Sequence, residues 1–323
     1  MAKVVTIHRV GGPEALSYED VEVGAPGPDE LRIRQSQCGV NFIDTYFRSG
    51  LYPRPLPFII GQEAVGEIVE LGSNVSGFAV GDRITYSTME GGGYASERLI
   101  SRDMAIRVPE WVSDQAAAAL TMKGLTAQML LRQTYKAGPG TVMLVHAAAG
   151  GVGTILSQWG AYIGATVIGT VGSEEKMQVA RDNGCAEVID YSRENFADRV
   201  REITRGELCD VVYDGVGKTT ATGSLDSLKP LGMFVSYGNA SGPVESFSML
   251  ELAKRGSLFA TRPMMPHYAS TPAKRDAMIK EFYALLKDGA IRNPPIKEFA
   301  LQDAAQAHRE LEGRAAGCFV LVP

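Results

Sequence analysis

The chain has 323 residues, 45% of them apolar, which suffices for two domains with separate hydrophobic cores. Its net charge of −5 argues against the broad basic surface of a nucleic-acid-binding protein. The sequence contains neither the apolar core of a signal peptide nor an apolar run long enough to cross a membrane. We therefore expect a cytoplasmic protein that binds neither membranes nor nucleic acid.

The four cysteines and four histidines are scattered along the chain and form no C-x-x-C pair. This spacing argues against a disulfide framework and against a structural zinc site. We expect no bound metal.

The N-terminal third of the chain predicts a β-rich domain. Residues 31–36 and 65–72 alternate apolar and polar side chains, as half-buried strands do. Turn signals such as Gly11-Gly12-Pro13 and Gly91-Gly92-Gly93 separate such segments. Short strands at this spacing indicate a barrel-like or sandwich-like domain. Residues 114–135 then predict a helix.

From about residue 125 to 260 the pattern alternates between strands and helices, which predicts a parallel sheet covered by helices. The expected strands are 142–146, 166–171, 187–190, 209–213 and 233–237, and the expected helices are 174–183, 194–204 and 219–228. Beyond them we expect helices at 274–289 and 303–311 and a strand at 318–322.

One segment has the pattern of a dinucleotide-binding turn. The apolar strand 142–146 leads into small residues and then into an amphipathic helix that begins near Thr154. In such a motif, one glycine permits a tight turn, one lets the backbone approach a pyrophosphate and one lets helix and strand pack closely. We assign these roles to Gly150, Gly151 and Gly153. The N-terminus of the helix attracts phosphate, so the residues expected to bind the pyrophosphate are Ala149, Gly150, Gly151, Val152 and Gly153.

A glycine-rich turn alone can also be a plain strand–helix connector. Here a second strand, residues 165–171, completes a strand–helix–strand unit around the motif, which favours a nucleotide site. NAD sites usually place an acidic residue at the end of this second strand, but residues 170–173 carry none.

The next residues suit a 2′-phosphate instead. Gly172, Ser173 and Lys176 offer a small turn, a hydroxyl and a positive charge. Glu174 and Glu175 are better explained as first-turn acids that favour the helix dipole. The sequence therefore predicts NADPH rather than NADH, although Lys176 could also be an ordinary exposed lysine.

Several segments together resemble the zinc-free quinone oxidoreductases of the medium-chain dehydrogenase/reductase superfamily. The resemblance runs over nearly the whole chain and is carried by residues 38–46, 48–53, 123–126, 146–153, 169–173, 212–217 and 236–239.

This resemblance implies a mixed α/β protein with a GroES-like, partly open β-barrel domain and a Rossmann doubly wound parallel-sheet domain. It implies that residues 1–124 form the first part of the GroES-like catalytic domain, residues 125–260 bind NADPH, and residues 261–323 return to the catalytic domain. It also implies a homodimer.

Zinc-dependent relatives differ at two positions that bind the metal. They carry a cysteine where this chain has Asn41, and a histidine where it has Gln62, before Glu63. Amide side chains are poor zinc ligands compared with thiolate and imidazole. The cysteine cluster of their structural zinc is also absent from residues 85–98. Alcohol oxidation assisted by a Lewis acid is therefore not expected.

A quinone or a conjugated enone needs little more than hydride delivery, because its conjugated carbonyl spreads the developing negative charge. The resemblance implies that Asn41, Tyr46 and Tyr52 lie beside the nicotinamide and the acceptor, where amide and phenol groups can donate hydrogen bonds. From the sequence alone, Asn41 could be a local turn cap and the tyrosines could be packing residues.

Other contacts with the cofactor are implied only by the resemblance. They fall on Thr126, Tyr191, Gly215, Tyr237, Asn239 and Arg314. The C-terminal tail is one residue shorter than is usual in the family, which leaves the register of Arg314 open. Cys318 stands where the family usually has a small or basic residue, so we assign it no catalytic role.

The leading hypothesis is NADPH-dependent reduction of quinones by hydride or electron transfer, without zinc. One alternative is reduction of the double bond of enones or alkenals, since the same hydride geometry serves both reactions. Another is a non-catalytic nucleotide- or RNA-binding role, because a fold does not fix a function.

Overall fold

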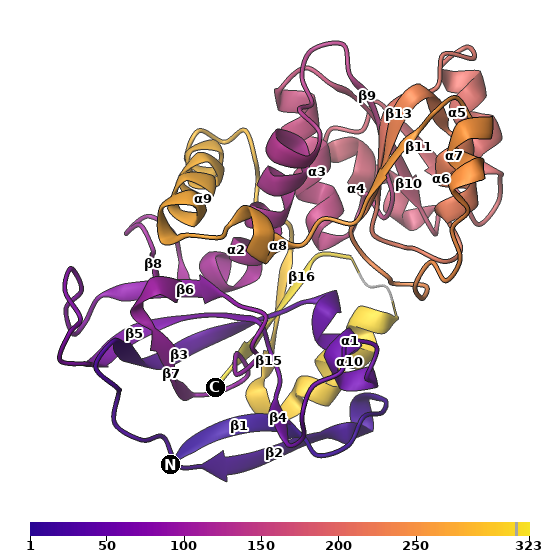
Figure 1. Ribbon diagram of the computed structural model, residues 1–323. Coiled ribbons are helices and arrows are strands. Elements are labelled where there is room, and N and C mark those ends of the chain that lie inside the picture. The colour runs from indigo at the N-terminus through magenta and orange to yellow at the C-terminus, as the bar shows by residue number, and fades with distance from the viewer. Residues whose placement is uncertain (314–315) are drawn as a thin grey trace. The chain divides into compact units, whose positions relative to one another are not determined.

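The chain divides into two compact units in the computed structural model, which describes residues 1–313 and 316–323 (Figure 1). The first unit contains residues 1–122, 271–276 and 293–323, and the second contains residues 123–270 and 277–292. Two helices contribute to both units, α2 (Asp114–Gln128) and α9 (Pro272–Lys287). The expected domain boundary near residue 124 thus falls inside α2, and part of the expected C-terminal segment, 277–292, belongs to the second unit.

The first unit is built on a seven-stranded sheet with the order β15-β16-β3-β5-β6-β8, in which β7 also pairs with β3. Its strands are β3 (Glu30–Val40), β5 (Glu63–Leu71), β6 (Arg83–Ser87), β7 (Glu97–Ser101), β8 (Ile106–Arg107), β15 (Ile296–Ala300) and β16 (Cys318–Val322). The alternation expected at 31–36 is confirmed, since Leu31 and Ile33 are buried while Arg34 is exposed. The C-terminal strand joins this sheet by pairing antiparallel with β3.

Smaller elements complete this unit. A three-stranded sheet has the order β2-β1-β4, with β1 (Ala2–Ile7), β2 (Leu16–Val21) and β4 (Phe58–Ile59). The helices are α1 (Phe42–Ser49) and α10 (Ala304–Glu312), with short 3₁₀ turns η1 (Pro13–Ala15), η2 (Arg102–Met104) and η4 (Leu301–Asp303). Residues 42–49 were not expected to be helical, because their neighbourhood predicts strands and turns.

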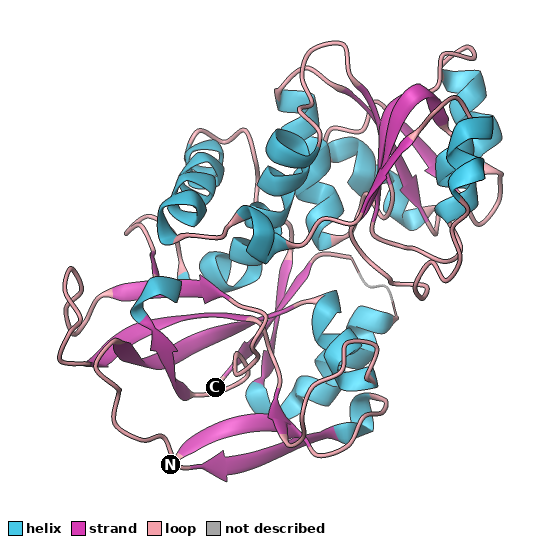
Figure 2. Cartoon of the chain, in the orientation of Figure 1, coloured by secondary structure: helices cyan, strands magenta, loops and turns pink. Residues whose placement is uncertain are grey.

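The second unit is a six-stranded parallel sheet with the order β11-β10-β9-β12-β13-β14. Its strands are β9 (Val142–Val145), β10 (Thr166–Val171), β11 (Glu187–Asp190), β12 (Cys209–Asp214), β13 (Leu228–Ser236) and β14 (Phe259–Thr261). The helices are α3 (Gly151–Tyr162), α4 (Glu175–Asp182), α5 (Phe196–Ile203), α6 (Ala221–Asp226), α7 (Met249–Lys254) and α8 (Met265–Tyr268). Helices α3 and α4 cover one face of the sheet and α5, α6 and α7 the other (Figures 1 and 2).

The doubly wound sheet predicted for this region is therefore confirmed, and all five expected strands are present. The sixth strand, β14, and helices α7 and α8 were not expected, since they are short and lack a clear hydrophobic period. The helix expected over 114–135 is α-helical to Gln128 and then widens into a π-helical turn, η3 (Met129–Thr134). In that turn the Tyr135 N–H donates to the Leu130 carbonyl at 3.1 Å. No helix among the described residues is long and apolar enough to span a bilayer.

Candidate functional site

The turn between β9 and α3 leads directly into the N-terminus of a helix, where the sequence predicts the pyrophosphate site. Gly150 has an ordinary extended conformation, with φ −83° and ψ 171°, and precedes the first residue of α3. The left-handed residue is Ala147, with φ 52°. Gly150 closes the turn that begins at Ala147, since its N–H donates to the Ala147 carbonyl at 2.8 Å, but its own backbone conformation does not require glycine.

The role assigned to Gly153 is confirmed. A Cβ at this position would lie 2.2 Å from the Ala147 carbonyl oxygen and 2.9 Å from Ala148 Cα, so only glycine fits. This close approach brings the first turn of α3 against the end of β9. The N–H groups of that first turn have no partners within the helix and carry a partial positive charge. Gly150, Gly151, Val152 and Gly153 thus meet at one helix N-terminus, directly after Ala149.

A second group of predicted residues gathers after β10. The Tyr191 hydroxyl faces Gly172, where a Cβ would lie 2.7 Å from it. The Lys176 N–H donates to the Ser173 carbonyl at 3.1 Å, which places both residues at the start of α4. The structure therefore brings Gly172, Ser173, Lys176 and Tyr191 together at the carboxyl ends of β10 and β11.

Sequence reasoning missed one cation in this group. The Arg193 guanidinium lies 2.9 Å from the Glu174 carboxylate, and both side chains are largely exposed. The pair neutralises one of the two acids whose presence complicated the prediction of a phosphate site. A basic residue two positions after Tyr191 was the available signal.

The ends of β12 and β13 form a third group. A Cβ on Gly215 would lie 2.9 Å from the Tyr237 hydroxyl, and a Cβ on Gly238 would lie 2.3 Å from the Gly215 carbonyl oxygen. Asn239 follows and accepts from the Gly242 N–H through its carbonyl at 3.0 Å. Ligands bind at such carboxyl ends in open parallel sheets. Thr126 lies half-buried on α2, whereas Arg314 lies outside the described residues.

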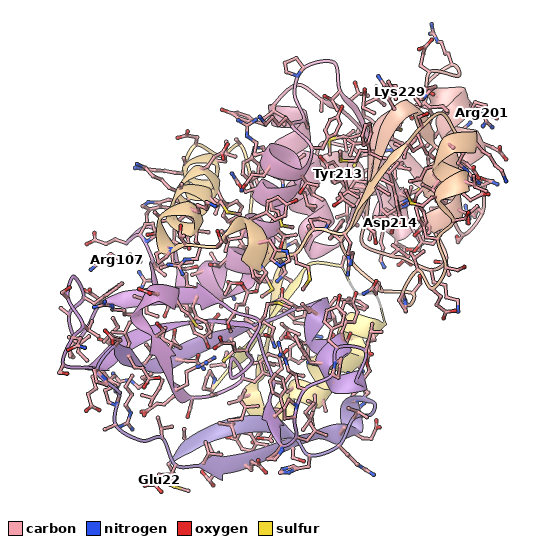
Figure 3. All side chains as sticks on the ribbon, in the orientation of Figure 1. Glu22, Arg107, Arg201, Tyr213, Asp214 and Lys229 are labelled. Carbon is pink, nitrogen blue, oxygen red and sulfur yellow. The ribbon has the colours of Figure 1, made fainter. Side chains whose placement is uncertain are left out.

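A buried polar network, not foreseen from the sequence, supports these strand ends. The Asp214 carboxylate, fully buried, accepts from the Val216 and Gly217 N–H groups at 2.8 and 2.9 Å. It also accepts from the hydroxyls of Thr220 and Ser224, each at 2.8 Å. Figure 3 shows Asp214 beside Tyr213 within this unit. The network fixes the turn that contains Gly215.

His146 extends the network from β12 to β10. Its ring nitrogens lie 2.8 Å from the Thr170 hydroxyl and 2.9 Å from the Ser224 hydroxyl. Burial lowers the pKa of this imidazole, so it is neutral near pH 7. Three strand ends are thus joined beneath the predicted cofactor-binding turns.

In the first unit, Asn41 precedes α1 and is almost fully buried. The Asn41 N–H donates to Asp44 Oδ2 at 2.8 Å, and the Asp44 N–H donates to the Asn41 carbonyl at 3.0 Å. These reciprocal bonds form a helix cap. Asn41 is therefore the cap of α1, as its local alternative predicts, and its side-chain amide has a further partner.

That partner is Glu63, a fully buried carboxylate on β5. Asn41 Nδ2 donates to Glu63 Oε1 at 2.8 Å, and the Met122 N–H donates to Glu63 Oε2 at 2.7 Å. A buried carboxylate is stable only when such donors satisfy it. Glu63 therefore fixes the orientation of the Asn41 amide.

Tyr46 and Tyr52 lie next to each other, with ring centroids 5.3 Å apart in an edge-on arrangement. The Tyr52 N–H donates to the Tyr46 carbonyl at 3.0 Å. Tyr46 is mostly buried on α1, and Tyr52 is half-buried. The three acceptor-site candidates therefore come from one short stretch, Asn41 to Tyr52.

The positions that bind catalytic zinc in zinc-dependent relatives carry a different donor set here. Gln62 Oε1 accepts from the Gly91 N–H at 3.3 Å, and Glu63 is engaged by Asn41 and Met122. Across residues 1–313 and 316–323, no group of three or more histidine, cysteine, aspartate or glutamate side chains is arranged to hold a metal ion. Two amides and an engaged carboxylate are a poor match for zinc.

Comparison with known families matches both halves of the chain. Residues 27–110 match the family described as "Alcohol dehydrogenase GroES-like domain", and residues 151–271 match "Zinc-binding dehydrogenase". The GroES-like and Rossmann architectures expected from the sequence are thereby confirmed.

Full-length relatives are also found. A "Quinone oxidoreductase" of Pseudomonas aeruginosa is 48% identical over 100% of both chains. A "2-haloacrylate reductase" of Burkholderia sp. is 44% identical over 100% of this chain and 99% of its own. The crystal structure of Escherichia coli quinone oxidoreductase complexed with NADPH is 40% identical, with a TM-score of 0.97 over 99% of this chain and 100% of that one.

Proposed function

Because the chain belongs to the quinone oxidoreductases of the medium-chain dehydrogenase/reductase superfamily, we propose that it reduces quinones with NADPH. The observation that supports the binding of NADPH is the α3 cradle, the turn from Ala147 to Gly153 at the start of α3, which only glycine at position 153 permits. The full-length similarity to quinone oxidoreductases, one of them complexed with NADPH, supports quinone reduction as the reaction.

The second unit would hold the cofactor. The N–H groups at Gly151, Val152 and Gly153, after Ala149 and Gly150, bind the pyrophosphate. Ser173 and Lys176 bind the 2′-phosphate, and Tyr191 packs at the adenosine end behind Gly172. The remaining contacts are assigned to Thr126, Gly215, Tyr237, Asn239 and Arg314.

The bound cofactor supplies the hydride, and the protein's own part is to bind and orient the acceptor. Asn41, with its amide fixed by Glu63, and the hydroxyls of Tyr46 and Tyr52 act as donors toward the acceptor oxygen. None of these three residues needs to transfer a proton, because water can protonate the reduced product. Orientation is the main contribution required of these residues.

A titration with NADPH and NADH, followed by turnover with 1,4-benzoquinone, tests this function. We expect tight binding of NADPH, weaker binding of NADH, and turnover that a chelator does not change. Turnover that stops on chelation and returns with zinc would contradict the zinc-free mechanism. Absence of nucleotide binding would contradict the role of the α3 cradle.

Reduction of an activated carbon–carbon double bond is the second candidate, favoured by the likeness to the 2-haloacrylate reductase. The same hydride delivery serves both acceptors. Rates with naphthoquinones and with 2-alkenals or 2-haloacrylate rank the two, and a large preference for the alkenes would replace the quinone assignment. A non-catalytic RNA-binding role fits poorly with a net charge of −5.

We also propose a homodimer formed along β14. This strand is one of the two edges of the parallel sheet. Large apolar side chains from this part of the chain are exposed, namely Leu231, Met249, Leu250, Phe259 and Met264. An open, apolar sheet edge favours pairing with a second copy. Sedimentation of the protein and of Phe259→Glu tests this, and a wild-type monomer at micromolar concentration would contradict it.

The four cysteines are free and buried, which suits a cytoplasmic location.

A further inference from the structure

Four buried polar side chains form a row between α1 and α10, and only Asp44 has been described so far, as part of the cap of α1. Its members are Asp44 and Arg48 on α1, Tyr94, and His308 on α10, and none is more than 2% exposed. Tyr94 Oη lies 3.0 Å from Asp44 Oδ2 and 3.0 Å from His308 Nε2. Arg48 Nη1 lies 3.0 Å from His308 Nδ1. The row thus joins the N-terminal end of α1, near Asn41, to the C-terminal helix.

The chemistry of the end groups fixes the direction of every hydrogen bond in this row. A guanidinium can only donate, so His308 Nδ1 accepts from Arg48 and the ring proton sits on Nε2. His308 Nε2–H then donates to Tyr94 Oη, and the Tyr94 hydroxyl donates to the Asp44 carboxylate. The same carboxylate oxygen accepts the Asn41 N–H. The chain of donors therefore ends on the cap of α1.

Tyr94 is held in place by its backbone, which makes it a fixed reference for α1. Its N–H donates to the Ile60 carbonyl at 2.8 Å, and its carbonyl accepts from the Val5 N–H at 2.9 Å. Gly61, in the left-handed region at φ 94°, packs so closely that a Cβ would lie 2.5 Å from Tyr94 N. The Tyr94 hydroxyl consequently has little freedom to move.

The other end of the row is anchored as well. Arg48 Nη2 donates to Glu312 Oε1 at 2.6 Å and Arg48 Nε donates to the Gly11 carbonyl at 3.1 Å. Burial and the Arg48 charge lower the pKa of His308 to about 3, and burial with Asp44 raises that of Tyr94 well above its usual value. Both groups are therefore neutral throughout the working pH range, and the bond directions do not change within it.

We propose that Tyr94 and His308 are positioning residues of the acceptor site: through Asp44 they fix the start of α1, and with it the Asn41 amide and Tyr46. This inference rests on the proposed function, which places Asn41 and Tyr46 at the acceptor. Neither Tyr94 nor His308 needs to touch substrate. Their effect is on the efficiency of acceptor reduction and not on the binding of NADPH.

Tyr94→Phe tests this, because it removes one hydroxyl and keeps the buried ring. Tyr86→Phe is the matched control: Tyr86 is equally buried in the same core, and its hydroxyl bonds to Gln35 instead of to α1. The measurements are Tm, the Kd for NADPH by fluorescence, and kcat and KM for benzoquinone. We expect Tyr94→Phe to lower kcat/KM for the quinone about tenfold, since small displacements of positioning groups cost catalysis heavily. The Kd for NADPH should stay unchanged, and Tyr86→Phe should lower Tm alone.

A double-mutant cycle with Asn41→Ala separates this inference from the proposed function. If Tyr94 acts through Asn41, the loss caused by Tyr94→Phe largely disappears in the Asn41→Ala background. Equal behaviour of Tyr94→Phe and Tyr86→Phe, with Asn41→Ala still impaired, overturns the inference and leaves the proposed function standing. If Asn41→Ala itself retains full activity, both the acceptor-site assignment and the inference are overturned.

Discussion

The proposed cofactor site at the glycine turn of the second unit and the proposed acceptor site at α1 of the first unit offer different kinds of groups. The turn from Ala147 to Gly153 offers backbone groups, and it depends on the absence of a side chain at one position. The α1 region offers side chains, and their orientation depends on buried partners such as Glu63 and Asp44. A backbone site tolerates almost no added atom, whereas a side-chain site is sensitive to the loss of a hydrogen-bond partner.

The largest effect should follow from Gly153→Ala. The added methyl would lie 2.2 Å from the Ala147 carbonyl oxygen, so the turn or the helix must move. We expect NADPH affinity to fall by about 100-fold and the free energy of unfolding to fall by about 3 kcal/mol. Nucleotide titration and urea unfolding measure these two changes.

Gly150→Ala is the matched control, because Gly150 has an ordinary backbone conformation and its Cβ would come no closer than 3.1 Å to another atom. It should bind NADPH far better than Gly153→Ala. Equal losses in the two variants would show that the turn is sensitive to bulk in general, and the backbone argument for Gly153 would fail.

Glu63→Gln should have the next largest effect and tests the side-chain site. Asn41 Nδ2 and the Met122 N–H donate to different oxygens of Glu63, and in glutamine one of these oxygens becomes an NH2 group, so one donor faces another donor. We expect the free energy of unfolding to fall by about 2 kcal/mol, together with a lower kcat/KM for the quinone. Glu67→Gln, which alters an exposed ion pair with Arg34, should cost about 0.5 kcal/mol or less. If Glu63→Gln were as mild as this control, Asn41 would not depend on Glu63.

Lys176→Ala distinguishes a charge that binds the cofactor from a charge on the surface. Loss of a charge-assisted bond to the 2′-phosphate should raise the KM for NADPH about tenfold, with the KM for NADH unchanged. Lys254→Ala, at the end of α7, removes a lysine paired with Glu251 and should alter neither constant. An unchanged preference for NADPH in Lys176→Ala would remove this residue from the phosphate site and leave Arg193 as an alternative cation.

The smallest expected effect is on the pH dependence of stability. Unfolded His308 binds a proton near its ordinary pKa of 6.5, but in the folded protein the pKa is about 3. The unfolded state therefore binds more protons between these values, and stability is lost as the pH falls through that window. From pH 7.5 to 5.5 the loss due to His308 is about 1 kcal/mol.

Urea unfolding of the wild type and of His308→Gln at the two pH values measures this contribution, which the variant should lack. His146, in the second unit, also has a pKa lowered by burial. His146→Gln should therefore remove a separate part of the pH dependence. If the wild type and both variants showed the same pH dependence of stability, His146 and His308 would not be the neutral, buried histidines described here.

The sequence by itself determined the strand–helix–strand unit, the glycine turn between its first strand and its helix, and the close packing at Gly153. These features depend on local rules, since hydrophobic period and small side chains are visible along a few residues. The alternation of buried and exposed side chains along β3 was predictable for the same reason. The prediction of NADPH rather than NADH followed from the absence of an acidic side chain at residues 170–173.

Only the tertiary structure decided that the left-handed residue is Ala147 and that Asn41 caps a helix. It also brought His308 within hydrogen-bonding distance of Tyr94 and joined β16 to β3, although these segments are far apart in the chain. The spacing of residues along the sequence does not predict such contacts, because they arise when separate elements bury their polar groups against one another. A strand, a turn and a helix leave a pattern along a few residues, whereas the residues that hold a side chain in position are found only in the folded protein.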